Sequence, residues 1–210
     1  MSADSPVIIE AAINGGSSKR RNPNVPREPE EIIEDTFRCL DAGASIIHAH
    51  NRDYALHGKP AADDYLQAWR VILKERPDTL WYPTLSGGGN VLEVLEHVEL
   101  IAQELPLRIG VVDPGSTNIG RPGEDGLPIG VVYHNSYEDI RSSFAFCERL
   151  KLGPSLAIYE PGFMQTALSY WRAGRLPQGA RVKFYFGGPY GMFGTGPGVS
   201  FGLPPTENAL

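Results

Sequence analysis

The fold class is decided by one stretch of the sequence, Ala44-Ser45-Ile46-Ile47-His48-Ala49-His50-Asn51-Arg52-Asp53. Its apolar first half predicts a buried β-strand over residues 44–50. Residues two apart on a strand point to the same face, so His48 and His50 project side by side from the end of this strand. Two such imidazoles supply half of a metal site, and Zn²⁺ is the metal that most favours them. A hydrogen-bonded pair of core histidines is the alternative that the spacing leaves open.

Apolar strands and amphipathic helices alternate along the rest of the chain. The further strands are predicted at residues 7–13, 79–84, 107–112, 155–159 and 182–186. The helices are predicted at residues 29–42, 63–75, 91–105, 137–150 and 163–173. Residues 113–133 are rich in glycine and proline and are predicted to form one long loop. The near-continuous apolar strands are typical of a parallel sheet that is covered on both faces.

Polar and glycine-rich residues follow all six predicted strands. A (β/α)8 TIM barrel carries its active site at this end of its strands, whereas a doubly wound sheet binds mainly at one switch point. The sequence therefore predicts an α/β TIM barrel. Because a complete barrel needs ~250 residues, we expect this chain to supply the first six β/α units of a single domain over residues 1–210. The natural chain is then expected to continue beyond Leu210 for ~60 to 100 residues.

Composition and charge narrow the classes of function. The formal net charge of −6 disfavours nucleic acid and anionic membranes as partners. No apolar stretch is long enough to span a membrane, and the N-terminus lacks the pattern of a signal peptide. The two cysteines, Cys39 and Cys147, fall in predicted helices, so we expect reduced packing residues. These observations predict a cytoplasmic protein.

Several motifs, in the right order along nearly the whole chain, resemble those of the β-keto acid cleavage enzymes, typified by 3-keto-5-aminohexanoate cleavage enzyme. The matching segments are Ile9-Glu10-Ala11-Ala12-Ile13-Asn14-Gly15, Pro29-Glu30-Glu31, Asp41-Ala42-Gly43-Ala44, His48-Ala49-His50-Asn51-Arg52-Asp53, Pro83-Thr84-Leu85-Ser86-Gly87-Gly88, Gly115-Ser116-Thr117-Asn118, Tyr159-Glu160-Pro161-Gly162-Phe163 and Gly188-Pro189-Tyr190-Gly191-Met192. The resemblance implies a Zn²⁺-dependent barrel, commonly a homotetramer. It implies that a β-keto acid and acetyl-CoA are converted to acetoacetate and a new acyl-CoA. The family's two strand-borne metal ligands fall on His48 and His50.

Three departures from the family pattern bear on the reaction. The family's third metal ligand, a late glutamate, and the catalytic aspartate and arginine near it have no counterpart in this sequence, so we expect them to lie beyond Leu210. Ser17 replaces the acid often found after the first strand, and Leu85 occupies the place of a family serine. The catalytic residues are therefore left unassigned, and so is the identity of the β-keto acid.

The remaining polar residues at the strand ends are candidates for substrate binding. The glycine-rich loop before residue 91 can offer backbone N–H groups to a carboxylate, and an arginine can bind a carboxylate through two hydrogen bonds. The alternatives are an ordinary strand-to-helix turn and structural ion pairs. The predicted substrate-binding residues are Thr84, Ser86, Gly87, Gly88, Asp113, Ser116, Asn118, Glu160 and Arg52.

Two other classes of function stay open on the sequence. The first is a different metal-dependent barrel enzyme, a lyase or hydrolase that acts without CoA. The second is a non-catalytic binding protein on this fold, because a fold does not determine a function. Product analysis with and without acetyl-CoA distinguishes the first alternative from the acetyl-CoA-dependent reaction. Metal content distinguishes the second, because a metal-free protein would favour a binding protein.

Overall fold

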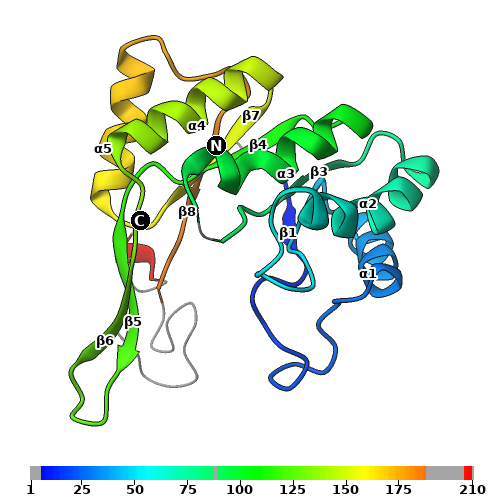
Figure 1. The fold of residues 1–210 in the computed structure, drawn as a ribbon, viewed down its shortest axis with the longest axis horizontal. Coiled ribbons are helices and arrows are strands. Elements are labelled where there is room, and N and C mark those ends of the chain that lie inside the picture. Colours follow the sequence, from blue (N-terminus) through cyan, green and yellow to red (C-terminus); the bar gives the residue numbers. More distant parts are fainter. Residues whose placement is uncertain (1–5, 88, 188–205, 210) are drawn as a thin grey trace. The chain divides into compact units, whose positions relative to one another are not determined.

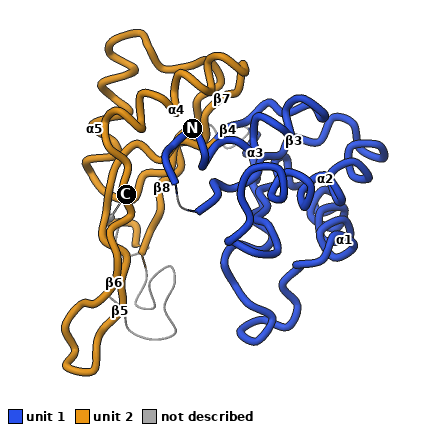
Figure 2. Tube along the Cα trace, in the orientation of Figure 1, with its two compact units in different colours: residues 1–110 blue, residues 111–210 orange. Residues whose placement is uncertain are grey.

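The computed structural model describes residues 6–87, 89–187 and 206–209, which form an α/β fold of strands and helices (Figure 1). Contacts divide the chain into two compact units, residues 1–110 and 111–210 (Figure 2). The first unit contains β1 (Glu10–Ala12), α1 (Pro29–Asp41), β2 (Ile46–Ala49), α2 (Gly58–Glu75), β3 (Leu80–Pro83) and α3 (Val91–Glu104).

The strands that follow belong to the second unit or reach its boundary. They are β4 (Ile109–Val112), β5 (Thr117–Pro122), β6 (Pro128–Tyr133), β7 (Gly153–Ile158) and β8 (Arg181–Phe184). The helices are α4 (Tyr137–Leu150), α5 (Pro161–Arg172) and the short 3₁₀ helix η1 (Glu207–Ala209). None of the helices in the described ranges is long and apolar enough to cross a membrane.

The first unit is built on a three-stranded parallel sheet in the order β1-β2-β3. Ala12, His48 and Tyr82 lie opposite one another across the three strands, and so do Ala11, Ile47 and Trp81 one residue earlier. Because side chains alternate along each strand, these two rows point to opposite faces. The register therefore puts His48 and Tyr82 on one face and the apolar core on the other.

The core of the first unit lies between the helices and the face of the sheet that carries Ile47 and Trp81. Ile47 and Trp81 are at most 1% exposed and pack with residues of α1, α2 and α3. The indole rings of Trp69 and Trp81 stack with their centroids 3.9 Å apart. This helix-covered face anchors β2 firmly, which fixes the direction in which its histidines emerge.

The second unit has a three-stranded sheet in the order β4-β7-β8 and a separate hairpin. β7 is buried along its whole length, as the sequence predicts for a central strand, and it pairs in parallel with β8. The two long helices of the second unit, α4 and α5, begin after the polar residues Ser136 and Glu160. Ser136 caps α4 by accepting a hydrogen bond from the N–H of Asp139.

The prediction of one long loop over residues 113–133 is wrong. The strands β5 and β6 form an antiparallel hairpin, with Gly120 opposite Gly130, which extends away from α4 and α5 (Figure 1). A Cβ atom on Gly130 would lie 2.0 Å from the backbone oxygen of Ile119, so glycine here permits close pairing of the strands. Most of β6 is exposed, and the glycines and prolines within and between the two strands give this segment the composition of a loop.

The other predicted elements are confirmed, with shifts of a few residues at their ends. α2 begins five residues before its predicted start, at Gly58. Cys39 and Cys147 are free thiols, as expected. The parallel pairs agree with an α/β class, but the described residues form separate three-stranded sheets and show no closed eight-stranded barrel. The TIM barrel, its six units and the single domain therefore stay predictions.

Some of the sequence predictions, Gly88 among them, fall on residues that the structure does not describe. The motif over residues 188–192 lies outside the described residues, and so does Leu210. The expected continuation of the chain beyond Leu210 is therefore not tested by the structure and stays a prediction.

Candidate functional site

His48 and His50 meet at the carboxyl end of β2. His48 is the third residue of the strand, and His50 follows its last residue. Both side chains are half-buried, and their Nε2 atoms lie 3.0 Å apart. Two nitrogens bound to one tetrahedral Zn²⁺ lie roughly 3.3 Å apart, so a small movement of either ring would admit the ion. The geometry fits the predicted pair of ligands.

The other nitrogen of each ring faces a polar partner. Nδ1 of His48 lies 3.2 Å from the backbone oxygen of Tyr82. A carbonyl oxygen only accepts, so this nitrogen carries the proton and leaves the Nε2 lone pair of His48 available. Nδ1 of His50 bonds to the hydroxyl of Tyr54. Histidine ligands of metals commonly have such a partner on the second nitrogen.

The backbone of His50 is held by the side chain of Asn14. The amide oxygen of Asn14 accepts a hydrogen bond from the N–H of His50 at 2.9 Å, and its nitrogen donates to the oxygen of His50 at 3.0 Å. The same nitrogen donates to the oxygen of Pro26 at 3.3 Å. Asn14 is 6% exposed, and it connects the loop after β1 to the end of β2.

The ring of Tyr82 supports His48 from β3. The two rings stack with centroids 4.3 Å apart, and Tyr82 is fully buried. The hydroxyl of Tyr82 donates to the carboxylate of Glu10 on β1. This bond accounts for the acidic residue that the sequence places on the first strand, because a carboxylate in such a position needs a partner.

Two histidines alone are an incomplete ligand set for catalytic zinc, which usually has three protein ligands. In the part of the chain that the structure describes, no group of three His, Cys, Asp or Glu side chains is placed to hold a metal ion. That the third ligand and the catalytic acid lie beyond Leu210 stays a prediction.

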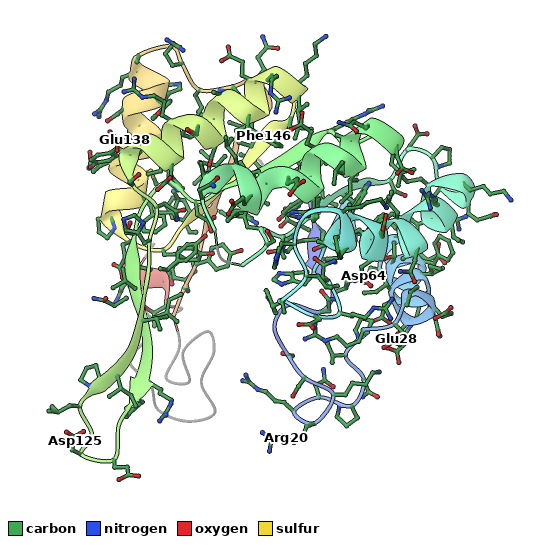
Figure 3. The ribbon with its side chains drawn as sticks, in the orientation of Figure 1. Arg20, Glu28, Asp64, Asp125, Glu138 and Phe146 are labelled. Carbon is green, nitrogen blue, oxygen red and sulfur yellow. The ribbon has the colours of Figure 1, made fainter. Side chains whose placement is uncertain are left out.

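Arg52, a predicted carboxylate-binding residue, is engaged by protein groups. Its guanidinium donates to Glu28 at 2.9 Å, to Asp64 at 2.5 Å and to Gln67 at 3.2 Å. Figure 3 labels Glu28 and Asp64, which join the start of α1 to α2 through this arginine. The structure therefore shows the ion pairs that the sequence left open as the alternative, and a role of Arg52 in substrate binding stays a prediction.

The predicted loop after β3 anchors the start of α3. The hydroxyl of Ser86 donates to the backbone oxygen of Val94 at 3.0 Å. The backbone oxygen of Thr84 accepts a hydrogen bond from Nε2 of the buried His97 at 2.8 Å. Gly87 is exposed, and Gly88 lies outside the described residues. These bonds make the loop rigid, and they leave its predicted role in binding substrate untested.

Asp113 follows β4 and forms a half-buried polar pair with Tyr133 in the second unit. Its Oδ2 accepts a hydrogen bond from the hydroxyl of Tyr133 at 2.6 Å, while its Oδ1 is buried with no hydrogen-bond partner among the described residues. Burial raises the pKa of Asp113 to about 6, against the bond from Tyr133 and the charge of Lys183, which both lower it. The same surroundings raise the pKa of Tyr133 above its usual value. Asp113 can therefore exchange a proton near neutral pH.

Three other predicted substrate-binding residues belong to the second unit. Ser116 donates to the backbone oxygen of Asn135 at 2.9 Å, which ties the start of the hairpin to its end. Asn118 is exposed on β5. Glu160 precedes α5 and is half-buried. Their roles in binding substrate stay predictions.

Comparison with known proteins identifies the family. A family model described as beta-keto acid cleavage enzyme matches residues 6–205. The chain belongs to the β-keto acid cleavage enzyme family. The resemblance first drawn from the motifs, above all the histidine pair at the end of β2, is thereby confirmed.

Curated relatives are distant. The chain is 27% identical over 184 residues to the 3-keto-5-aminohexanoate cleavage enzyme of Fusobacterium nucleatum, covering 86% of this chain and 63% of that one. It is 24% identical to the enzyme of the same name from Acetoanaerobium sticklandii, covering 97% of this chain and 72% of that one. It is 22% identical to the 3-oxoadipate:acetyl-CoA acetyltransferase of Cupriavidus necator, covering 87% of this chain and 60% of that one. The chain thus spans about two thirds of the length of these relatives.

Solved structures of ObcA share the fold. Its ternary complex with a C4-CoA adduct and oxalate gives a TM-score of 0.60 at 21% identity, covering 81% of this chain and 38% of that one. Its apo structure gives a TM-score of 0.59, covering 81% of this chain and 37% of that one. At this identity the likeness concerns the fold alone.

Sequence reasoning missed three residues that the structure brings to these sites, Asn14, Tyr54 and Tyr133. The first two contact His50, and the third contacts Asp113. Asn14 ends a predicted strand beside two glycines, which is also the signature of a turn. Only the family resemblance, whose first motif contains Asn14, carried a signal for it.

Proposed function

We propose that this chain carries out the family reaction, in which a β-keto acid and acetyl-CoA give acetoacetate and a new acyl-CoA, within a (β/α)8 barrel that holds Zn²⁺ at His48 and His50. Family membership and the similarity to a 3-oxoadipate:acetyl-CoA acetyltransferase support the use of acetyl-CoA. The observation that carries the zinc site is the 3.0 Å approach of two Nε2 atoms whose rings are held at Nδ1. The homotetramer and the cytoplasmic location stay predictions.

Within this proposal, each residue at the histidine pair has a definite task. His48 and His50 present Nε2 lone pairs, the carbonyl of Tyr82 accepts the Nδ1 proton of His48, and Asn14 keeps the backbone of His50 in place. Zn²⁺ bound there supplies a Lewis acid for the keto and carboxylate oxygens of the substrate. Burial raises the pKa of the thiols of Cys39 and Cys147, so neither is an activated nucleophile, and we expect no covalent acyl-enzyme.

The test begins with metal content. We expect the wild-type protein to bind one Zn²⁺ per chain, and the variants His48→Ala and His50→Ala to lose it. The matched control is His57→Ala, since His57 is exposed and its side chain makes no capping hydrogen bond to α2. Full metal content in either site variant would show that the imidazoles are only a hydrogen-bonded pair.

The reaction is tested with acetyl-CoA and a panel of β-keto acids that differ in chain length and terminal charge. Mass spectrometry should detect acetoacetate together with a new acyl-CoA for at least one acid. Turnover of a β-keto acid without acetyl-CoA would indicate a lyase or hydrolase instead. A metal-free wild-type protein that turns over none of the acids would favour a binding protein.

A further inference from the structure

We propose that Asn14 and Tyr54 are positioning residues that prepare His50 to bind a divalent cation, Asn14 by holding its backbone and Tyr54 by setting the tautomer of its ring. This inference rests on the proposed function, because it assumes that a cation sits between His48 and His50. It assigns a role to two residues that contact the reacting groups only through His50.

Asn14 takes over where the β-ladder ends. The last backbone hydrogen bond between β1 and β2 runs from the N–H of Ile13, just after β1, to the oxygen of His48 at 3.1 Å. β2 itself ends at Ala49. The Asn14 side chain then bonds to both polar backbone atoms of His50, at 2.9 and 3.0 Å. One amide group therefore acts as a further rung of the sheet and fixes residue 50 where a strand end would otherwise fray.

Burial makes this clamp effective. Asn14 is 6% exposed, and its oxygen also accepts a hydrogen bond from the N–H of Gly15 at 2.9 Å. Hydrogen bonds shielded from water are costly to leave unmade, so the backbone of His50 has one strongly preferred place. A backbone fixed in this way limits the ring of His50 to movements about its own side-chain bonds.

Tyr54 controls the proton on the ring. A hydroxyl can donate or accept, and Tyr54 meets Nδ1 of His50. If the hydroxyl donates, the proton of a neutral His50 is on Nε2, and the 3.0 Å contact with His48 is an imidazole–imidazole hydrogen bond. If the hydroxyl accepts, the proton is on Nδ1 and both rings present Nε2 lone pairs. Rotation of the Tyr54 hydroxyl, coupled to loss of the His50 proton from Nε2 to water and uptake of a proton from water at Nδ1, thus converts a hydrogen-bonded pair into a pair of metal ligands.

The local packing favours this role for Tyr54. A Cβ atom on Gly16 would lie 3.4 Å from the Tyr54 ring, so the ring rests close against the loop that carries Asn14. Tyr54 remains 42% exposed, which leaves its hydroxyl room to rotate. The loop after β1 therefore contacts His50 directly through Asn14 and indirectly through Tyr54.

The test measures Zn²⁺ affinity by competition with a chromogenic chelator. We expect Tyr54→Phe, which removes the acceptor for Nδ1–H and little else, to bind Zn²⁺ about 10- to 100-fold more weakly. Asn14→Asp keeps the acceptor for the His50 N–H and replaces the donor to its oxygen by a carboxylate, so we expect a loss of at least similar size. The matched controls are Tyr137→Phe on α4, where the side chain is 74% exposed, and Asn24→Ala in an exposed loop.

A second readout separates positioning from stability. With Co²⁺ in place of Zn²⁺, the visible absorption bands report ligand geometry, and we expect them to change in Tyr54→Phe but not in the controls. Unfolding of the metal-free protein should be nearly unchanged in Tyr54→Phe, since the ring and its packing against Gly16 are kept and only the hydroxyl is removed. If Asn14→Asp fails to fold, Tyr54→Phe still decides the question.

The outcomes distinguish this inference from the proposed function. Wild-type Zn²⁺ affinity and Co²⁺ spectrum in Tyr54→Phe would overturn the role of Tyr54, and wild-type affinity in a folded Asn14→Asp would overturn that of Asn14. A wild-type protein that binds no Zn²⁺ would overturn both proposals. If the variants lose Zn²⁺ as expected while the wild type transfers no acyl group, the positioning roles stand and the proposed reaction falls.

Discussion

Replacement of Asp113 by Asn should remove a pH dependence from the stability of the second unit. Asp113 is half-buried with its Oδ1 atom shielded from solvent, and its pKa is raised from the ordinary 3.8 to about 6. A group that binds protons more tightly in the folded state than in the unfolded state favours folding at low pH. Its contribution is therefore lost as the pH rises from about 4 to about 6.

The size of the effect follows from the shift. A shift of about two pKa units corresponds to at most about 3 kcal/mol in the free energy of unfolding. The wild type should lose up to about this much relative to Asp113→Asn over that range, and the difference should be constant above it. Because Tyr133 donates to Asp113 at 2.6 Å and lowers its pKa, Tyr133→Phe should move the transition to higher pH.

The assay is urea unfolding at a series of pH values, followed by circular dichroism, for the wild type and Asp113→Asn side by side. The difference between the two proteins cancels the titration of all other carboxylates. Asp125→Asn is the matched control, because Asp125 lies exposed at the tip of the hairpin (Figure 3). A wild-type-minus-variant difference that does not fall between about pH 4 and about pH 6 would refute the argument.

Three further changes probe the elements that carry the sites. Trp81→Ala removes a ring that is 1% exposed and stacked on Trp69, and should lower the free energy of unfolding by about 3–5 kcal/mol in a urea titration. Asn90→Ala removes the side chain that caps α3, and thermal unfolding should show a loss of about 1 kcal/mol; an unchanged midpoint would contradict the cap. Gly130→Ala places a Cβ atom 2.0 Å from the backbone oxygen of Ile119, so the cross-strand contacts of the hairpin in NMR spectra should weaken or shift register.

The alternation of strands and helices was predictable because it follows from local patterns. Apolar runs and helical spacing placed β2 and α1 within a few residues of their observed bounds, and the period of two on a strand predicted that His48 and His50 would lie together. These features depend on neighbours along the chain. A sequence displays such neighbours directly.

The hairpin β5–β6 was not predictable from the same patterns. β5 is mainly half-buried and β6 mainly exposed, and their glycines and prolines give the segment the composition of a loop. Gly120 and Gly130 serve the close pairing of the two strands, which only the folded hairpin reveals. The partners of Arg52 were missed for a related reason. Glu28 and Asp64 lie 24 and 12 residues away along the chain, and only the packing of α1 beside α2 brings them to the guanidinium.

The sequence by itself determined the strand order along the chain, the shared face of the two histidines and, through its motifs, the family. The tertiary structure decided how those histidines are held. Asn14 reaches His50 across 36 residues, and the carbonyl of Tyr82 meets His48 across 34, because the parallel register of β1, β2 and β3 aligns their ends. Register arises from the packing of whole strands and helices, and no local pattern of residues encodes the hydrogen bonds it creates.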